Sequence, residues 1–599
     1  ITDGQPDRTG RSRGKETDML GGGLIARMLR AEGVEVVFGI IDGSYIGLYS
    51  QLREHGIRLI SPRHETSAVH MAGAYARLTG KLGVCIASNG PGAANALPGV
   101  AVEDGEGNRV LLITSWRRTG IVNPDRGGTY QYFDQLNVTA PMTKWTGAVE
   151  NFARLPEMMR RAFRMSWQGR PGVVHMTVPE DIMNGNFDTE PPVLVPAEYR
   201  RTRPLEPDRA EVKEAADMLL AAEQPMIHAG SGVLHARAFE ELRAVADALS
   251  APVTTSWAGR AVIDERADVA IPMNLVGVVN KVRNEADLVL ALGTRFGETD
   301  WWGKAPYWRK PGEQKLIQVD IDEERIGVNK PVTLAVLADA RAFLAALAAE
   351  LVSRGDLPRT EARRKALDGY VEAKNEFRAT GAGPILETPA DPLHSAWVPI
   401  IAQDVLGDDA VVIADGGNTT VWAGAFHEVR RPCSHLSTYK FGMLGAGIGQ
   451  TLGAKVACPD RPVYCIIGDG AMGFHCQEIE TAVRNKLAVI FIVLCDRQWG
   501  MVKFNQCMAL NPQGMKERRS LSSNETINTD FSEIRFDMLA EAMGAHGERV
   551  SKIDDLAGAL QRAADSGKCA IVHVDVDPVV HMWAPNLDTF KEMHLEPAG

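Results

Sequence analysis

The chain has 599 residues, of which 45% are hydrophobic and 24% are charged, a composition typical of a folded protein with several domains. Its 65 basic and 76 acidic residues leave a net charge of −11, which argues against nucleic acid as the main partner. No apolar run approaches the roughly 18 residues of a membrane span, and no secretory signal is visible at the start. We therefore expect a cytoplasmic protein that binds neither nucleic acid nor membranes.

The eight cysteines are scattered, and no two of them form a Cys-x-x-Cys pair. Most stand in apolar, strand-like contexts such as Val84-Cys85-Ile86. This pattern predicts buried free thiols and argues against a zinc site or a disulfide framework.

Residues 1–16 are polar and charged, and we expect a disordered or arm-like leader there. From 17 to 190, helical and strand-like segments alternate, which predicts a doubly wound α/β domain with a mainly parallel sheet. Its expected strands are 34–41, 82–87, 110–114 and 173–178, and its expected helices include 22–32 and 66–78.

A second α/β domain is expected over 205–352, with strands at 226–229, 253–255, 288–292 and 316–320. The turns Gly230-Ser231-Gly232 and Gly293-Thr294-Arg295 end two of these strands and would suit a nucleotide diphosphate. A glycine turn alone is weak evidence, so FAD, ADP or no ligand at all remain open for this domain. Residues 353–395 are charged and then contain Pro and Gly, which indicates a connector.

The third α/β domain is expected over 396–576, and it holds the most informative stretch of the chain. An apolar run at 463–467 precedes Gly468-Asp469-Gly470, a helix-like segment covers 475–486, and a second apolar run at 488–494 ends in Cys495-Asp496. This order predicts a βαβ unit with Asp469 and Asp496 at the tips of two parallel strands. The tail 577–599 would be a lid over the site, a strap on a neighbour or a docked end.

Two carboxylates beside a glycine turn suit Mg²⁺ that holds a diphosphate. Glycine lets backbone N–H groups approach phosphate, and the N-terminus of the following helix favours negative charge. For Asp469 alone, an ordinary Asp-Gly turn is the competing interpretation, but the paired spacing argues against it.

Gly468-Asp469-Gly470 followed by Cys495-Asp496 resembles the thiamine diphosphate motif, which opens Gly-Asp-Gly and normally closes Asn-Asn. The resemblance implies that Asp469 and Asp496 bind Mg²⁺ through their side chains and Gln498 through its backbone carbonyl. The resemblance also implies cofactor contacts from Gly468, Gly470, Ala471 and Met472. Asp in place of the second Asn still supplies an oxygen ligand, but it adds a negative charge.

His64-Glu65, the helix behind it, Ser88-Asn89-Gly90-Pro91-Gly92 and Asn95 resemble the pyrimidine-binding domain of the acetolactate synthase group. By this resemblance Glu65 is catalytic and contacts N1′ of the aminopyrimidine, and Asn95 is a cofactor residue. The 4′-imino tautomer so favoured removes the C2 proton of the cofactor to give the ylide. Taken alone, Glu65 could equally be an acid in the first turn of a helix.

Further motifs of the same group follow in the expected order. Asp415-Gly416-Gly417-Asn418-Thr419 resembles the second diphosphate loop, which makes Asn418 and Thr419 candidates. In Phe441-Gly442-Met443-Leu444-Gly445 the Gly442 carbonyl would accept from the 4′-amino group, and Leu444 would bend the cofactor unless it is ordinary core. Gln318-Val319-Asp320-Ile321-Asp322 resembles the middle domain. In this family two subunits share the site, so a homodimer or homotetramer is implied.

The resemblance implies a lyase or carboligase that acts on a 2-oxo acid or a 2-hydroxy ketone through an acyl carbanion. Tyr130-Gln131-Tyr132 stands where acetolactate synthases have Phe-Gln-Glu; Gln131 remains a candidate for the substrate pocket, and the missing acid argues against simple acetolactate synthesis. Arg430-Arg431 stands near the coenzyme A position of oxalyl-CoA decarboxylase relatives, or is a solvated pair. The alternatives are a 2-hydroxyacyl-CoA lyase or oxalyl-CoA decarboxylase relative, and a catalytically silent homologue.

Overall fold

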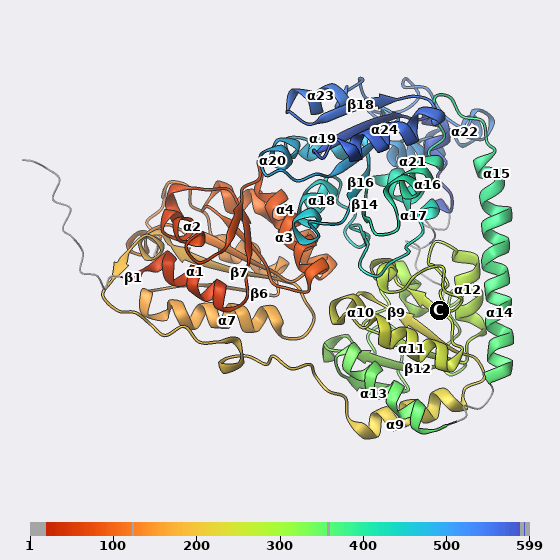
Figure 1. Cartoon of the computed structure of the whole chain (residues 1–599), viewed down its shortest axis with the longest axis horizontal. Helices are drawn as coiled ribbons and strands as arrows, with labels where there is room; N and C mark the ends of the chain where they lie inside the picture. The colour runs from red at the N-terminus through yellow and green to blue at the C-terminus, as the bar shows by residue number, and fades with distance from the viewer. Residues whose placement is uncertain (1–18, 123–124, 356–359, 588–591, 593–599) are drawn as a thin grey trace, which may run out of the picture.

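The structure is a computed structural model that describes residues 19–122, 125–355, 360–587 and 592. The expected leader, residues 1–16, lies outside the described residues, as does part of the expected tail. Figure 1 shows three α/β units, the first at the left, the third at the top and the middle one at the lower right. Each has a parallel sheet with helices around it, which confirms the predicted fold class.

The first unit is built on a six-stranded parallel sheet in the order β3-β2-β4-β5-β7-β6. Its strands are β2 (Val36–Gly39), β3 (Arg58–Ile60), β4 (Gly83–Ala87), β5 (Val110–Trp116), β6 (Trp145–Ala148) and β7 (Val173–Pro179). Its main helices are α1 (Gly21–Ala31), α3 (Glu65–Thr79), α4 (Pro91–Glu106) and α7 (Leu155–Trp167). A short antiparallel pair joins β1 (Met19–Leu20) to β8 (Asn186–Phe187).

Side chains of each strand alternate between two apolar cores, one on each face of this sheet. Val84 and Ile86 of β4 pack in the core that includes α1 and α7. Cys85 and Ala87 face the opposite core, which includes α3 and α4. Burial on both faces explains why these strands read as continuous apolar runs in the sequence.

The middle unit has a five-stranded parallel sheet in the order β10-β9-β11-β12-β13. The strands are β9 (Pro225–Ala229), β10 (Val253–Thr255), β11 (Leu288–Leu292), β12 (Lys315–Asp320) and β13 (Leu334–Leu337). Its helices include α9 (Arg209–Ala221), α11 (Phe239–Leu249), α12 (Val276–Glu285) and α13 (Ala340–Ser353).

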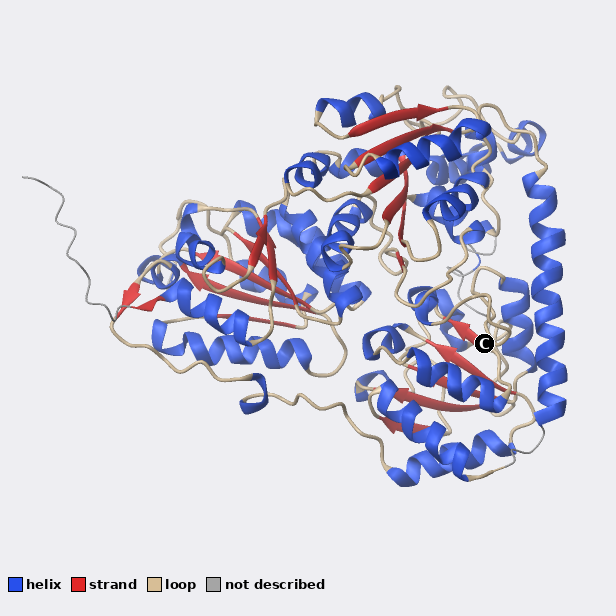
Figure 2. Cartoon of the chain, viewed as in Figure 1, coloured by secondary structure: helices blue, strands red, loops and turns tan. Residues whose placement is uncertain are grey.

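The stretch expected to be a connector contains a long helix, α14 (Thr360–Glu376), which Figures 1 and 2 show along the edge of the molecule between the middle and third units. Leu367 and Tyr370 are buried at helical spacing. The many charged residues on the exposed face of α14 hid this apolar spacing in the sequence.

The third unit repeats the strand order of the first: β15-β14-β16-β17-β19-β18. Its strands are β14 (Val411–Asp415), β15 (His435–Leu436), β16 (Val463–Gly468), β17 (Ile490–Cys495), β18 (His546–Val550) and β19 (Ala570–Asp575). In each of the two units one long helix connects the second strand to the third, α3 in the first and α18 (Ala446–Ala457) in the third. These equivalent helices lie side by side and join the units (Figure 1).

Glycines allow α3 and α18 to approach closely. A Cβ atom at Gly453 would lie 2.3 Å from the carbonyl oxygen of Met71, and one at Gly449 would lie 2.8 Å from His70 Cβ. Both distances are too short for a side chain, so the contact between the first and third units depends on these two glycines.

The prediction of a single helix over 475–486 was wrong, because the helical segment begins earlier and is divided into two helices. Helix α19 (Asp469–His475) begins directly at Gly468, and a second helix, α20 (Glu478–Arg484), follows it. Gly470 and Gly473 made the first turns of α19 look like a loop, because glycine has low helix propensity. The consequence is that Asp469 lies in the first turn of a helix.

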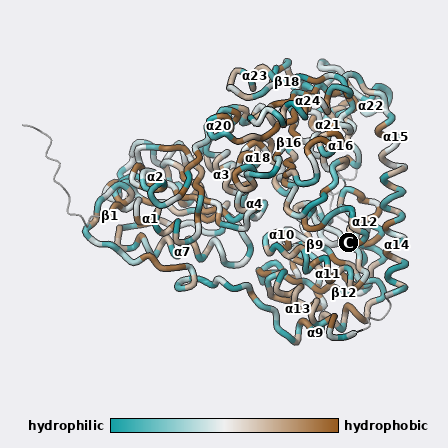
Figure 3. Tube along the Cα trace, viewed as in Figure 1, coloured by the Kyte–Doolittle hydropathy of each residue, from teal (hydrophilic) through white to brown (hydrophobic). Residues whose placement is uncertain are grey.

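Hydrophobic segments occur within each of the three units (Figure 3). The eight cysteines all lie within the described ranges as free thiols, six of them buried, as predicted. Among the described residues, no helix is long and apolar enough to cross a membrane.

Candidate functional site

Three helices of the third unit begin at neighbouring points: α17 (Gly417–Phe426), α19 and α21 (Gly500–Leu510). A Cβ atom at Gly468 would lie 2.9 Å from Thr419 Oγ1, and one at Gly500 would lie 2.8 Å from Asn418 Nδ2. The first N–H groups of a helix lack partners within it and carry a partial positive charge. Three such ends at one place favour an anionic group such as a diphosphate.

Asp469 and Asp496 come together here because they follow β16 and β17, which pair in parallel. Asp469 accepts hydrogen bonds from the backbone N–H of Gly470 at 2.7 Å and of Arg497 at 2.8 Å. Burial raises the pKa of Asp469 to about 6, and burial together with the neighbouring Asp469 raises the pKa of Asp496. Two buried carboxylates in contact suit a bound cation, which would stabilise both charges.

Several polar atoms at this place have no partner among the described residues. They are Asp496 Oδ2 and both side-chain polar atoms of Asn418, all of them buried. A Cβ atom at Gly500 would lie 2.8 Å from Asn418 Nδ2 and 3.0 Å from Asp496 Oδ2, so glycine keeps the space between them open. Because buried polar groups are normally hydrogen-bonded, these orphaned atoms indicate the place of a bound group.

A cavity of about 280 Å³ lies beside these helix ends. Asp415, Gly416 and Gly417 line one part of it, and Gly442 and Leu444 line another. Of the sequence-predicted residues of the third unit, Gly442 and Leu444 therefore line the same space as the 415–417 turn that precedes Asn418 and Thr419. Gly442 has a φ of +68°, a left-handed conformation that favours glycine and that sets the direction of its carbonyl group.

The remaining wall of this cavity includes residues that sequence reasoning missed. From the middle unit come Trp257, Asn274, Val276 and Thr299, and from the third unit Tyr439. Pro585 and Asn586 of the expected tail also line it, and Asn586 Nδ2 donates to the Asn274 carbonyl at 3.3 Å. No local sequence pattern predicts these residues, because only the packing of the units brings them to the cavity.

Glu65 and Asn95 lie together, but apart from this cavity. Glu65 is the first residue of α3, it is buried, and its Oε2 accepts from Asn95 Nδ2 at 3.1 Å. Gln131 is exposed with a φ of +52°, and its carbonyl accepts from Asn89 Nδ2 at 2.7 Å. None of the three is among the residues that line the 280 Å³ cavity of the chain.

The other candidates lie on α17, on α19 and just before α21. Ala471 and Met472 are buried in α19. Gln498 is buried, and its side-chain Nε2 donates to the Pro578 carbonyl at 2.8 Å. The candidate metal ligand, the backbone carbonyl of Gln498, takes no part in this contact. Thr419 Oγ1 lies 3.3 Å from Nε2 of His581, a buried residue that the sequence did not single out.

A second cavity, of about 510 Å³, lies at the middle unit. Both predicted glycine turns line it, and a Cβ atom at Gly232 would lie 2.6 Å from the Gly293 Cα. Arg170, Arg295 and Lys440 also line it. With Arg109 and Arg325, which line it too, the cavity combines close backbone approach with five cationic side chains.

Lys440 is the lysine among these cations. Burial lowers its pKa to about 8; Glu106 opposes this shift, and Arg295, Arg170 and Arg77 add to it. An anion in the cavity would favour the protonated amine.

Arg430 and Arg431 are both paired with acids. Arg430 contacts Asp408 at 2.7 Å and Glu428 at 3.1 Å, and Arg431 forms an ion pair with Asp409. These surface ion pairs match the solvated interpretation of the arginine pair.

Comparison with known families covers all three units. The N-terminal TPP-binding domain of thiamine pyrophosphate enzymes matches residues 19–138, the central domain 212–347 and the C-terminal TPP-binding domain 415–574. The chain belongs to the thiamine pyrophosphate enzyme family. The matched range 415–574 includes the N-terminal ends of α17, α19 and α21.

Similar proteins include the sulfoacetaldehyde acetyltransferase of Alcaligenes xylosoxydans xylosoxydans, 31% identical over 91% of each chain. The acetolactate synthase isozyme 2 large subunit of Escherichia coli K12 is 30% identical, over 94% of this chain and 97% of its own length. A probable acetolactate synthase large subunit of Methanococcus aeolicus is 28% identical, over 94% and 92%. The chain is thus a thiamine diphosphate-dependent enzyme of the acetolactate synthase type.

Proposed function

We propose that this enzyme uses Mg²⁺ and thiamine diphosphate to cleave a C–C bond of a 2-oxo acid or 2-hydroxy ketone and to pass the acyl group to an acceptor. The observation that carries the proposal is the buried, orphaned set of Asn418 and Asp496 atoms beside three helix N-termini. A diphosphate with its metal would satisfy these groups together.

The donor set suits Mg²⁺ better than a metal held by protein ligands alone. The candidates are the carboxylates of Asp469 and Asp496 and the carbonyl of Gln498. Among the described residues, no group of three His, Cys, Asp or Glu side chains is placed to hold a metal ion. Mg²⁺ commonly uses one or two carboxylates and takes its other oxygens from phosphate and water.

When bound, thiamine diphosphate supplies a carbon centre that adds to a substrate carbonyl and accepts the electron pair of the cleaved bond. Gly442 would accept from the 4′-amino group through its carbonyl, and Leu444 would hold the two rings close. Glu65 would hold a proton at N1′ of the pyrimidine. Glu65 is buried, which would keep water from that proton.

We propose that a second copy of the chain completes the site. Glu65 and Asn95 lie apart from the cavity of their own chain, whereas both halves of the site carry exposed apolar side chains. Phe441 beside Gly442 is 51% exposed, Phe474 on α19 is 49% exposed, and Tyr130 beside Gln131 is 75% exposed. A second copy that covered these aromatic side chains would remove their apolar surface from water, which favours association. A homodimer is the smallest assembly that would complete the site, and a homotetramer would contain two such pairs.

Hybrid dimers test the shared site. Proteins with Glu65→Gln and with Asp469→Ala should each be inactive, and a mixture refolded or expressed together should regain activity, because some dimers then keep one intact site. A mixture as inactive as its components would place both residues in one chain's site and contradict the shared arrangement.

The cavity favours a small substrate over an acyl-CoA. Its described lining residues include no Lys, Arg or His to meet the phosphates of coenzyme A, and Arg430 and Arg431 are engaged in ion pairs. The aromatic wall of Trp257 and Tyr439 suits a compact acyl group. The sequence keeps Glu65, Asp469 and Asp496, which argues against a catalytically silent homologue.

For the middle cavity we propose an ADP group, either as ADP itself or as part of FAD. Arg170, Arg295 and Lys440 would face its diphosphate, and the two glycine turns would approach the phosphate oxygens. Titration with ADP and with FAD separates the two sources, because FAD binding also changes the flavin absorbance. Absence of binding for both would refute this assignment.

The test of the reaction class is carbon dioxide release from pyruvate by protein reconstituted with thiamine diphosphate and Mg²⁺. Release that requires both cofactors supports decarboxylation of a 2-oxo acid and leaves the acceptor to be found. No release from pyruvate or from larger 2-oxo acids would exclude the 2-oxo acids and leave 2-hydroxy ketones or acyl-CoA substrates to be tested.

A further inference from the structure

The 437–445 loop, which carries Gly442 and Leu444, is fastened by a residue of the first unit. Glu106, the last residue of α4, accepts at Oε1 from the backbone N–H of Lys440 at 2.8 Å and of Phe441 at 3.1 Å. These residues are 334 and 335 positions away in the sequence. The contact joins the first unit directly to the backbone that precedes Gly442.

Burying the Glu106 carboxyl group costs free energy, which indicates that this side chain does more than fill space. Its side chain is fully buried, and burial raises its pKa, while Lys440, Arg77 and the two backbone N–H groups oppose that shift. It also stands at the C-terminal end of α4, where the helix dipole disfavours a negative charge. A buried acid persists in such a place only when its hydrogen bonds and neighbouring cations compensate.

Other contacts fix the residues on either side of Lys440 and Phe441: Tyr439 Oη lies 3.0 Å from His435 Nε2, and its ring packs against Trp257. Within the loop, the Gly442 N–H donates to the Thr438 carbonyl at 2.7 Å, and Thr438 Oγ1 donates to the Met443 carbonyl at 3.3 Å. Phe441 is half-exposed and packs near Gly105, since a Cβ atom at Gly105 would lie 3.1 Å from Phe441 Cδ2. Glu106 is therefore the polar anchor that fixes residues 440 and 441, immediately before Gly442.

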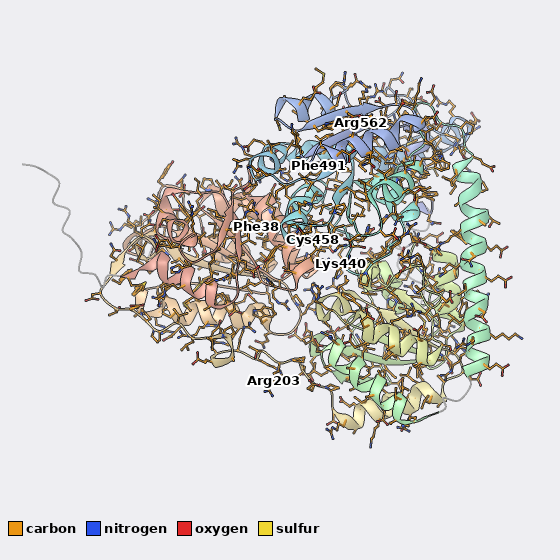
Figure 4. The ribbon with its side chains drawn as sticks, in the orientation of Figure 1. Phe38, Arg203, Lys440, Cys458, Phe491 and Arg562 are labelled. Carbon is orange, nitrogen blue, oxygen red and sulfur yellow. The ribbon has the colours of Figure 1, made fainter. Side chains whose placement is uncertain are left out.

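The same contact lies beside the second cavity. Figure 4 shows Lys440 where the three units approach one another, and both Lys440 and Gly107 line the 510 Å³ cavity. Glu106 thus binds the backbone of Lys440. The Lys440 residue lines the 510 Å³ cavity, and Gly442, two residues later, lines the 280 Å³ cavity.

We propose that Glu106 is a positioning residue for the reaction: by holding the N–H groups of Lys440 and Phe441, it fixes the Gly442 carbonyl where the thiamine diphosphate pyrimidine is bound. This inference rests on the proposed function, because it assigns a purpose to the loop that would hold the cofactor. It requires an acceptor oxygen at this distance, and it does not require the negative charge itself.

The experiment measures amide hydrogen exchange of residues 437–445 in cofactor-free protein. With Glu106→Ala, the amides of Lys440 and Phe441 should exchange roughly tenfold faster or more, the change expected on losing these two hydrogen bonds. In Glu106→Asp the shorter side chain does not reach the two N–H groups, so exchange should be as fast as in Glu106→Ala. Glu106→Gln keeps an acceptor oxygen, so its exchange should stay near the parental rate. If Glu106→Ala does not fold, the order of the Asp and Gln variants decides the question.

Glu103 provides a matched control one turn earlier on α4. It is equally buried, but among the described residues its carboxyl group bonds within the first unit alone, to His70 Nδ1 at 2.7 Å and Asn108 Nδ2 at 2.6 Å. Glu103→Gln should leave the exchange of Lys440 and Phe441 unchanged even where it lowers the unfolding temperature.

A second readout is exchange of the C2 proton of bound thiamine diphosphate, followed by NMR at saturating cofactor. It should slow in the Ala and Asp variants and recover in the Gln variant. Parental loop protection in Glu106→Ala, or loss in Gln with retention in Asp, would overturn the inference. Failure of the proposed function is distinguishable, because the parent protein itself would then show no C2 exchange.

Discussion

Replacement of Asn418 by leucine should stabilise the cofactor-free protein and weaken cofactor binding. Both polar atoms of the Asn418 side chain are buried without a partner among the described residues. Leucine has nearly the same shape and no polar atoms. Leaving a buried polar group unsatisfied costs about 1–3 kcal/mol, so Asn418→Leu should raise the free energy of unfolding by about that amount. For a domain of this size the unfolding midpoint should rise by about 2 °C or more.

Asn89 is the control for this prediction, because it is as buried as Asn418 but fully engaged. Its Nδ2 donates to the Gln131 carbonyl at 2.7 Å, and its Oδ1 accepts from Ser115 Oγ at 3.1 Å. Asn89→Leu should lower the midpoint measured by differential scanning calorimetry, whereas Asn418→Leu raises it. The affinity of Asn418→Leu for thiamine diphosphate should fall by about tenfold or more. A lower midpoint for Asn418→Leu in the absence of cofactor would refute the claim that its polar atoms await a ligand.

Three further outcomes are expected. Glu65→Gln should bind thiamine diphosphate but lose C2 proton exchange by NMR; unchanged exchange would exclude its catalytic role. Gly500→Ala places a methyl group against Asn418 and Asp496, so it should weaken cofactor binding in a calorimetric titration while the protein stays folded; parental affinity would show that this space is not used. The affinity for ADP should fall as the pH rises through about 8, because the Lys440 ammonium then loses its proton, and Lys440→Met should flatten that profile; identical profiles would exclude Lys440 from the anion site.

The local features of the site were predictable because each depends on a short stretch of sequence. Gly468-Asp469-Gly470 follows a buried strand, and parallel pairing of β16 with β17 then brings Asp469 to Asp496. Asp415, Gly442 and Leu444 also line one cavity, and each of them belongs to a short motif that can be recognised in the sequence.

The rest depended on contacts between units, which a single sequence does not encode in any local pattern. Trp257, Asn274 and Thr299 reach the cavity only because the middle unit packs against the third. The hydrogen bonds from Lys440 and Phe441 to Glu106 span more than half the chain. Low helix propensity concealed the start of α19, and surface charge concealed α14.

The central claim is that Mg²⁺ and thiamine diphosphate bind together at the helix ends beside Asp469 and Asp496. Isothermal titration of the cofactor-free protein with thiamine diphosphate, with and without Mg²⁺, tests it most directly. We predict tight binding of one cofactor per chain with Mg²⁺, much weaker binding without it, and loss of the Mg²⁺ effect in Asp469→Ala. Binding that is equally tight without Mg²⁺, or that survives Asp469→Ala unchanged, would contradict the account.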